Sequence, residues 1–232
     1  MLDTLANLDR ARDTVADKVT ELHREVGPVL DQAVRWKPVR WRGEVLGQLA
    51  DCLGSVADVS LPHTSDELLI RRRDVAGIDG LEARFLAAMV WGFGLRGYGP
   101  ARVGAIAHDG GPRLVPSLKG ICDAALVGPA DAWDAFTRCH KLKGLGPAFA
   151  TKVAYFASVA RGRLDRGPLI ADLNTSWAMW DLVRLPRSVE RFDSYVAYID
   201  LAHQWAEEIG CRPDDVERAL FEIGKTSTRT LN

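Results

Sequence analysis

Apolar side chains recur three or four residues apart along almost all of this 232-residue chain, and strict alternation of apolar and polar residues is rare. That spacing places them on one face of an α-helix. The pattern is clearest over five segments, at about residues 2–25, 80–90, 115–126, 188–209 and 213–224. A chain of this length can bury a hydrophobic core. We therefore expect an all-α protein that forms a single domain over residues 1–232.

Shorter helices are expected between these segments. The sequence is compatible with a short helix over 28–36 and with another over about 43–57. Ser65 has the position of an N-cap before Asp66, which predicts that a helix starts there. The glycine-rich stretch 91–100 is expected to be a loop, because glycines at this density favour turns over helix.

Basic residues are concentrated in one segment of a chain whose formal net charge is −1. Between residues 138 and 166 there are seven Lys or Arg side chains and a single acidic side chain, Asp165. The chain as a whole has no basic signature, so the distribution of charge is more informative than its total. This local excess indicates a surface for an anionic partner.

The cysteines do not form a metal-binding pattern. Zinc sites and iron–sulfur clusters need closely spaced thiolates, whereas the four cysteines are far apart in the sequence, at Cys52, Cys122, Cys139 and Cys211. We therefore expect no metal and no other cofactor. The N-terminus has no basic region followed by an apolar core, and no stretch reaches about 18 uninterrupted apolar residues. These features predict a cytoplasmic protein that does not enter the membrane.

Two helices joined by a tight turn are predicted over residues 131–160. The first helix would end near His140, and the turn Lys141-Leu-Lys-Gly-Leu-Gly-Pro147 follows it. Gly144 and Gly146 are expected to supply unusual backbone torsions, and Pro147 fits the first position of the second helix. Leu145 can fill the space between the two helices.

The turn and the loop after it resemble a known family. Leu142-x-Gly144-Leu145-Gly146-Pro147 is similar to the hairpin of the helix-hairpin-helix DNA glycosylases, the superfamily of endonuclease III and 8-oxoguanine DNA glycosylase. Gly167-Pro-Leu-Ile-Ala-Asp172 resembles the family's loop that ends in an apolar pair and an aspartate at a helix start. The whole stretch is similar to bacterial proteins described as having the 8-oxoguanine glycosylase fold. The resemblance implies two helical subdomains on either side of a cleft, with the aspartate within residues 161–182.

For the hairpin, the resemblance implies contacts with the backbone of double-stranded DNA. Amides at a helix N-terminus bind phosphate, and two lysines lie beside them in the sequence. These contacts are expected from Lys141, Lys143, Gly144, Leu145, Gly146 and Ala148.

Lys152 is the expected nucleophile, one helical turn beyond the usual place. In the common bifunctional enzymes of the family the lysine follows the second hairpin glycine by two residues, where this chain has Ala148. Lys152 is four residues later, on the same helix face. A lysine side chain is about as long as the rise of one helical turn, about 5.4 Å. Lys152 therefore has the reach to place its amine near the usual position. Apolar neighbours such as Phe149 and Phe156 favour a desolvated amine with a lowered pKa.

Asp172 is the expected carboxylate partner. An aspartate that caps a helix is held rigidly and can still direct one oxygen at a substrate, where it stabilises positive charge on the sugar and moves protons. An aromatic and basic loop that contains Arg96 suggests a pocket for an extruded base, with candidate residues Trp91, Tyr98 and Phe149. The run Arg71-Arg72-Arg73 is interpreted as a solvated helix face.

Together these features predict a monomeric DNA glycosylase that flips a damaged or modified base from the duplex. Through a Schiff base on Lys152 it would also be an abasic-site lyase, and it would be associated with the nucleoid when bound to DNA. Two alternatives stay open: a monofunctional glycosylase that uses Asp172 alone, and a non-catalytic helix-hairpin-helix DNA-binding protein. The resemblance favours 8-oxoguanine as the base, and a hypermodified base in foreign DNA is the second possibility.

Overall fold

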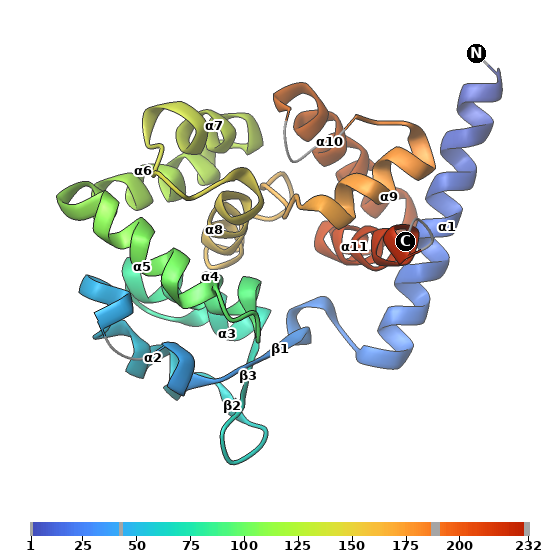
Figure 1. The fold of residues 1–232 in the computed structure, drawn as a ribbon. Coiled ribbons are helices and arrows are strands. Elements are labelled where there is room, and N and C mark those ends of the chain that lie inside the picture. The colour runs from blue at the N-terminus through green and yellow to red at the C-terminus, as the bar shows by residue number, and fades with distance from the viewer. Residues whose placement is uncertain (1, 42–43, 187–190, 230–232) are drawn as a thin grey trace.

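The structure is a computed structural model that describes residues 2–41, 44–186 and 191–229, and it is mostly helical (Figure 1). The predicted all-α class is confirmed. None of the described helices is long and apolar enough to cross a membrane. In chain order the α-helices are α1 (Leu2–Val26), α2 (Cys52–Asp58), α3 (Arg72–Gly77), α4 (Leu81–Phe93), α5 (Gly99–Gly110), α6 (Leu114–Val127), α7 (Pro129–Asp134), α8 (Pro147–Val159), α9 (Leu173–Val183), α10 (Phe192–Ile209) and α11 (Pro213–Arg229).

A small antiparallel sheet accompanies the helices, in the order β1 (Ala33–Trp36), β3 (Leu68–Arg71), β2 (Leu61–Pro62). The predicted helices over 28–36 and from Asp66 were therefore wrong. Val34 pairs with Ile70, and Ile70 is completely buried. Each of these strands forms because it pairs with a segment more than 30 residues away in the sequence. The local spacing of apolar residues gives no information about that partner.

Several predicted helix limits also differ. The helix expected over 43–57 is a 3-10 segment, η3 (Glu44–Leu49), followed by α2, and Gly47 inside η3 interrupts regular helix with a positive φ of 50°. Residue 43 lies outside the described residues, as do residues 188–190 of the expected helix that is observed as α10. The expected loop 91–100 is shorter, since α4 continues to Phe93 and α5 begins at Gly99.

The helices form two groups that meet at α8. One group contains α4, α6 and α8, and in the other α11 packs against α1, α9 and α10 (Figure 1). The groups are joined by buried polar contacts. The Tyr155 hydroxyl on α8 donates to Asp214 of α11 at 2.8 Å, and the Tyr198 hydroxyl on α10 donates to the carbonyl oxygen of Ile170 at 2.8 Å. The first bond joins α8 to α11, and the second holds the segment between α8 and α9, which crosses from one group to the other.

Candidate active site

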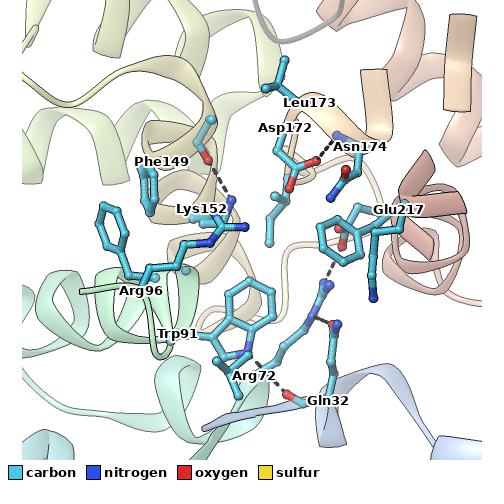
Figure 2. A pocket seen from close by; sticks show the side chains of 18 of the residues that line it. Gln32, Arg72, Trp91, Arg96, Phe149, Lys152, Asp172, Leu173, Asn174 and Glu217 are labelled. Carbon is cyan, nitrogen blue, oxygen red and sulfur yellow. Dashed lines mark hydrogen bonds and ion pairs between the residues drawn. The ribbon is translucent and has the colours of Figure 1, made fainter. Parts of the chain in front are cut away.

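A cavity of about 940 Å³ lies between the two helix groups (Figure 2). Its walls come from α4 with the loop after it, from α8, from the start of α9 and from α11, and the segment around β1 with α3 closes one side. Lys152 and Asp172 both line this cavity. The fold thus brings together the two residues that the sequence predicts to act as a pair.

Lys152 lies in the second turn of α8, and only 6% of its surface is exposed. Its Nζ atom donates a hydrogen bond to the carbonyl oxygen of Ala148 at 2.9 Å and lies 5.2 Å from the centre of the Phe149 ring. Side chains on a helix point back toward its N-terminus, and this one spans a full turn. The amine therefore lies beside residue 148, where the resemblance would place the lysine itself.

Gly92 gives the Lys152 side chain the room that it needs. A Cβ atom at Gly92 would lie 3.0 Å from Cδ of Lys152 and 2.9 Å from Cε1 of Phe149, both closer than ordinary contacts. Glycine inside a helix is destabilising by about 1 kcal/mol relative to alanine. The glycine in α4 allows the aliphatic part of Lys152 to pass directly over the helix backbone.

Burial lowers the pKa of Lys152 below its ordinary value of 10.5. The carboxylates of Asp172 and Glu217 oppose this shift, whereas the guanidinium groups of Arg72 and Arg96 reinforce it. A lower pKa increases the fraction of neutral amine near pH 7, and the neutral amine is the nucleophilic form.

Asp172 is the N-cap of α9. Its Oδ1 atom accepts hydrogen bonds from the backbone amides of Asn174 at 2.9 Å and Thr175 at 3.1 Å. The Thr175 hydroxyl in turn accepts a hydrogen bond from the Asp172 amide at 2.8 Å, which completes a capping box. The cap uses Oδ1, so the carboxylate is held in place while Oδ2 is left for the cavity.

The hairpin before α8 has one of the two expected glycine conformations. Gly144 has a φ of +85°, and a Cβ atom there would lie 3.1 Å from Ile106. Gly146 has an extended backbone that any residue adopts, so its predicted unusual torsion was wrong. Leu145 is 5% exposed and fills the space between the helices as predicted. The guanidinium of Arg102 donates to the Gly144 carbonyl oxygen at 3.1 and 3.3 Å and fastens the turn to α5.

Of the residues predicted to contact DNA, the lysines and Gly144 are exposed on the hairpin. Lys143 forms an ion pair with Asp109 at 3.0 Å, and Lys141 precedes it on the same turn. Ala148 instead lines the cavity and accepts the Lys152 hydrogen bond. The two hairpin lysines are thus exposed, and neither is among the residues that line the cavity.

Arg72 is buried, so the interpretation of Arg71-Arg72-Arg73 as a solvated face was wrong for its central member. Arg72 is 1% exposed and is paired with Glu217 of α11, and it donates to Gln32 Oε1 at 2.7 Å (Figure 2). The sequence does contain a signal for this. Arg72, Val75 and Ala76 are spaced as one face of a helix, and all three are buried.

Glu217 is a lining residue that the sequence analysis missed. Burial raises the pKa of its carboxyl group, and the Arg72 guanidinium opposes the rise. The Arg72 guanidinium lies 4.9 Å from the centre of the Trp91 ring and 5.2 Å from that of Tyr155. Glu217 is therefore anchored on one side of the cavity by a cation that aromatic rings surround.

Aromatic rings line the cavity, although not all those expected. Trp91 and Phe149, two of the candidates for a base pocket, line it, and Phe221, one turn after Glu217 on α11, also does. Tyr98 is not among the lining residues. It is 55% exposed at the start of α5, with its ring centre 5.4 Å from that of Phe93. The structure thus brings Trp91 and Phe149 to the cavity but leaves Tyr98 on the surface.

The chain matches a protein family described as "Putative 8-oxoguanine DNA glycosylase OGG-like protein" over residues 27–221. No curated protein and no solved structure gives a significant match. The matched range begins after α1 and extends into α11, so it includes every residue of the cavity lining named above.

Proposed function

The chain belongs to the OGG-like family of 8-oxoguanine DNA glycosylases, and we propose that it removes an oxidised or otherwise modified base from DNA and then cleaves the strand through Lys152. The main support is the buried, desolvated amine of Lys152, which lines the same cavity as the fixed carboxylate of Asp172. A cavity with these two side chains in its wall suits a nucleotide that has left the duplex, because a base inside the stack is out of reach.

The reaction follows from these two side chains. The neutral Lys152 amine attacks C1′ of the flipped nucleotide, and the glycosidic bond breaks with its electron pair going to the base, which is then protonated. Asp172 stabilises the positive charge that develops on the sugar. Opening of the sugar ring gives a Schiff base between C1′ and Nζ. Loss of a C2′ proton then breaks the C3′–O bond, and the 3′ phosphate leaves with the electron pair.

Glu217 supports a guanine-type base as the substrate. An ionised carboxylate only accepts hydrogen bonds, and the N1–H and amino groups of guanine form an edge of donors. Arg72 bonds to Oε2 of Glu217, which leaves Oε1 for such an edge. The rings of Trp91 and Phe221, which also line the cavity, can stack on a purine.

Borohydride reduction in the presence of a lesion-containing duplex tests the lyase. We expect a covalent protein–DNA adduct with the wild type and none with Lys152→Gln, whereas the matched variant Lys119→Gln, altered on the exposed face of α6, keeps the adduct. An adduct that persists in Lys152→Gln would show that the nucleophile is another residue.

Base release, measured by mass spectrometry over duplexes with oxidised, alkylated, deaminated and hypermodified bases, tests the glycosylase. We expect release of an oxidised guanine and loss of that release in Asp172→Asn. Release without an adduct would identify a monofunctional enzyme. DNA binding without release from any duplex would contradict the proposal and indicate a non-catalytic binding protein.

A further inference from the structure

We propose that Arg96 binds a phosphate group that flanks the flipped nucleotide and so holds its sugar against Lys152. This inference rests on the proposed function. It assigns to Arg96 a role in positioning the substrate, separate from the general attraction of DNA to the hairpin lysines.

The backbone of Arg96 is fixed although its side chain is not enclosed. Its amide donates to the Phe93 carbonyl oxygen at 3.0 Å, and its own carbonyl oxygen accepts from Gly99 at 3.3 Å. The neighbouring Leu95 carbonyl oxygen accepts a hydrogen bond from Arg40 at 2.9 Å. The loop between α4 and α5 therefore presents the Arg96 side chain from a fixed base, and the side chain extends toward Lys152 at the cavity (Figure 2).

The other cations that line the cavity are already engaged. Arg72 is paired with Glu217, Lys225 with Glu222 at 2.7 Å and Arg35 with Glu67 at 3.8 Å. The Lys152 amine donates to a carbonyl oxygen. Across the described ranges 2–41, 44–186 and 191–229, the Arg96 guanidinium has no hydrogen bond or ion pair with the protein. Arg96 is thus a cavity-lining charge that is open to an external anion.

A phosphate is the anion that the site would bring to this place. The sugar whose C1′ faces Lys152 carries a phosphate on each side, and these remain charged throughout the reaction. A guanidinium group matches phosphate oxygens with two parallel hydrogen bonds. The neutral Lys152 amine cannot hold the phosphate electrostatically, so Arg96 would do so. The positive charge of Arg96 also helps to lower the pKa of Lys152, which agrees with the two groups lying close together.

Binding to duplexes that carry a stable tetrahydrofuran abasic-site analogue tests the contact, because such binding needs no chemistry. Three duplexes are compared: one with natural phosphates, one with a neutral methylphosphonate on the 3′ side of the analogue, and one with it on the 5′ side. We expect Arg96→Gln to bind the natural duplex roughly tenfold more weakly than the wild type. One of the two methylphosphonates should weaken the wild type by a similar factor and leave Arg96→Gln unchanged, which identifies the bound phosphate.

Lys141→Gln is the matched control for loss of a positive charge near the DNA. It should weaken binding of all three duplexes and remain sensitive to the methylphosphonate that no longer affects Arg96→Gln. The proposal is overturned if both methylphosphonates weaken Arg96→Gln as much as the wild type, or if Arg96→Gln binds with wild-type affinity. Normal adduct formation together with either result would refute only the phosphate contact. If one methylphosphonate weakens the wild type but not Arg96→Gln, and the protein forms no adduct, only the lyase activity is refuted.

Discussion

The Nζ atom of Lys152 lies 2.9 Å from the carbonyl oxygen of Ala148, four residues earlier on the same helix. Lys152 lies one helical turn after the position that the family resemblance assigns to the lysine, and its side chain reaches back by nearly that turn. The position of a lysine in an alignment and the position of its amine in space are different quantities. For this chain the amine is at the start of α8, although the residue is not.

Replacing Gly92 by alanine should displace Lys152. The new methyl group would overlap Cδ of Lys152 and the Phe149 ring, so we expect adduct formation to fall at least tenfold, while affinity for duplex DNA stays near the wild-type value. Gly54→Ala, in the interior of α2 with nothing within 4 Å of its Cβ, is the control. Borohydride trapping rates and binding titrations measure the two effects. An unchanged trapping rate would show that Lys152 does not depend on the space above Gly92.

Lys152→Met should give a more stable protein that forms no adduct. Burial of the amine destabilises its charged form, so the substitution is expected to raise the free energy of unfolding by about 1 kcal/mol at pH 7. The lysine has a lower pKa in the folded than in the unfolded state, so its destabilising effect grows as the pH falls from about 10.4 through the folded-state pKa. Urea unfolding at pH 7 and pH 10 should show the difference between the two proteins shrinking at pH 10.

Asp172→Ser should keep the N-cap of α9 but remove the carboxylate on which the proposed reaction depends. Serine caps a helix about as well as aspartate, so stability should stay within about 0.5 kcal/mol of the wild type. Base release should be lost, because serine has no charge to stabilise the sugar cation. Asp172→Ala is expected to lose both release and about 1 kcal/mol of stability. Base release at the wild-type rate by Asp172→Ser would rule out a catalytic carboxylate at this position.

Glu217→Gln should destabilise the fold by leaving the buried Arg72 guanidinium without a counter-charge. Removing one member of a buried ion pair costs about 3 kcal/mol. The double variant Arg72→Met/Glu217→Gln should recover part of that loss, because the uncompensated charge is gone. Denaturant unfolding of the two single variants and the double variant gives the coupling energy. Additive losses would show that the two side chains do not stabilise one another.

The helices that carry the chemistry are visible in the sequence because their signals are local. Gly144, Leu145 and Pro147 fix the hairpin within a few residues, and Asp172 caps a helix that begins at the next position. The amphipathic pattern of α4 and α11 is equally local. The helical spacing of apolar residues predicted the fold class, and the family resemblance of the hairpin and of the loop before Asp172 implied the Lys152–Asp172 pair.

The rest of the cavity could not be derived in this way. Strand β1 exists because of its pairing with β3, and Arg72 is buried because Glu217 on α11 receives its charge, 145 residues away. Neither partner can be inferred from spacing along the chain. Even the spacing of Arg72 with Val75 and Ala76 indicates only an inward direction, and it does not identify what the guanidinium meets.

The residues that line the cavity come from separate helices. The lysine and the aspartate belong to α8 and the start of α9, whereas Glu217 and Phe221 belong to α11, which α1 and α10 hold from the other side. Under the proposed function, this face of α11 would contact the base, whereas Lys152 and Asp172 would act on the sugar. Because α9 packs against α11, a substitution on that face would be expected to change both the contact with the base and the position of the Asp172 cap.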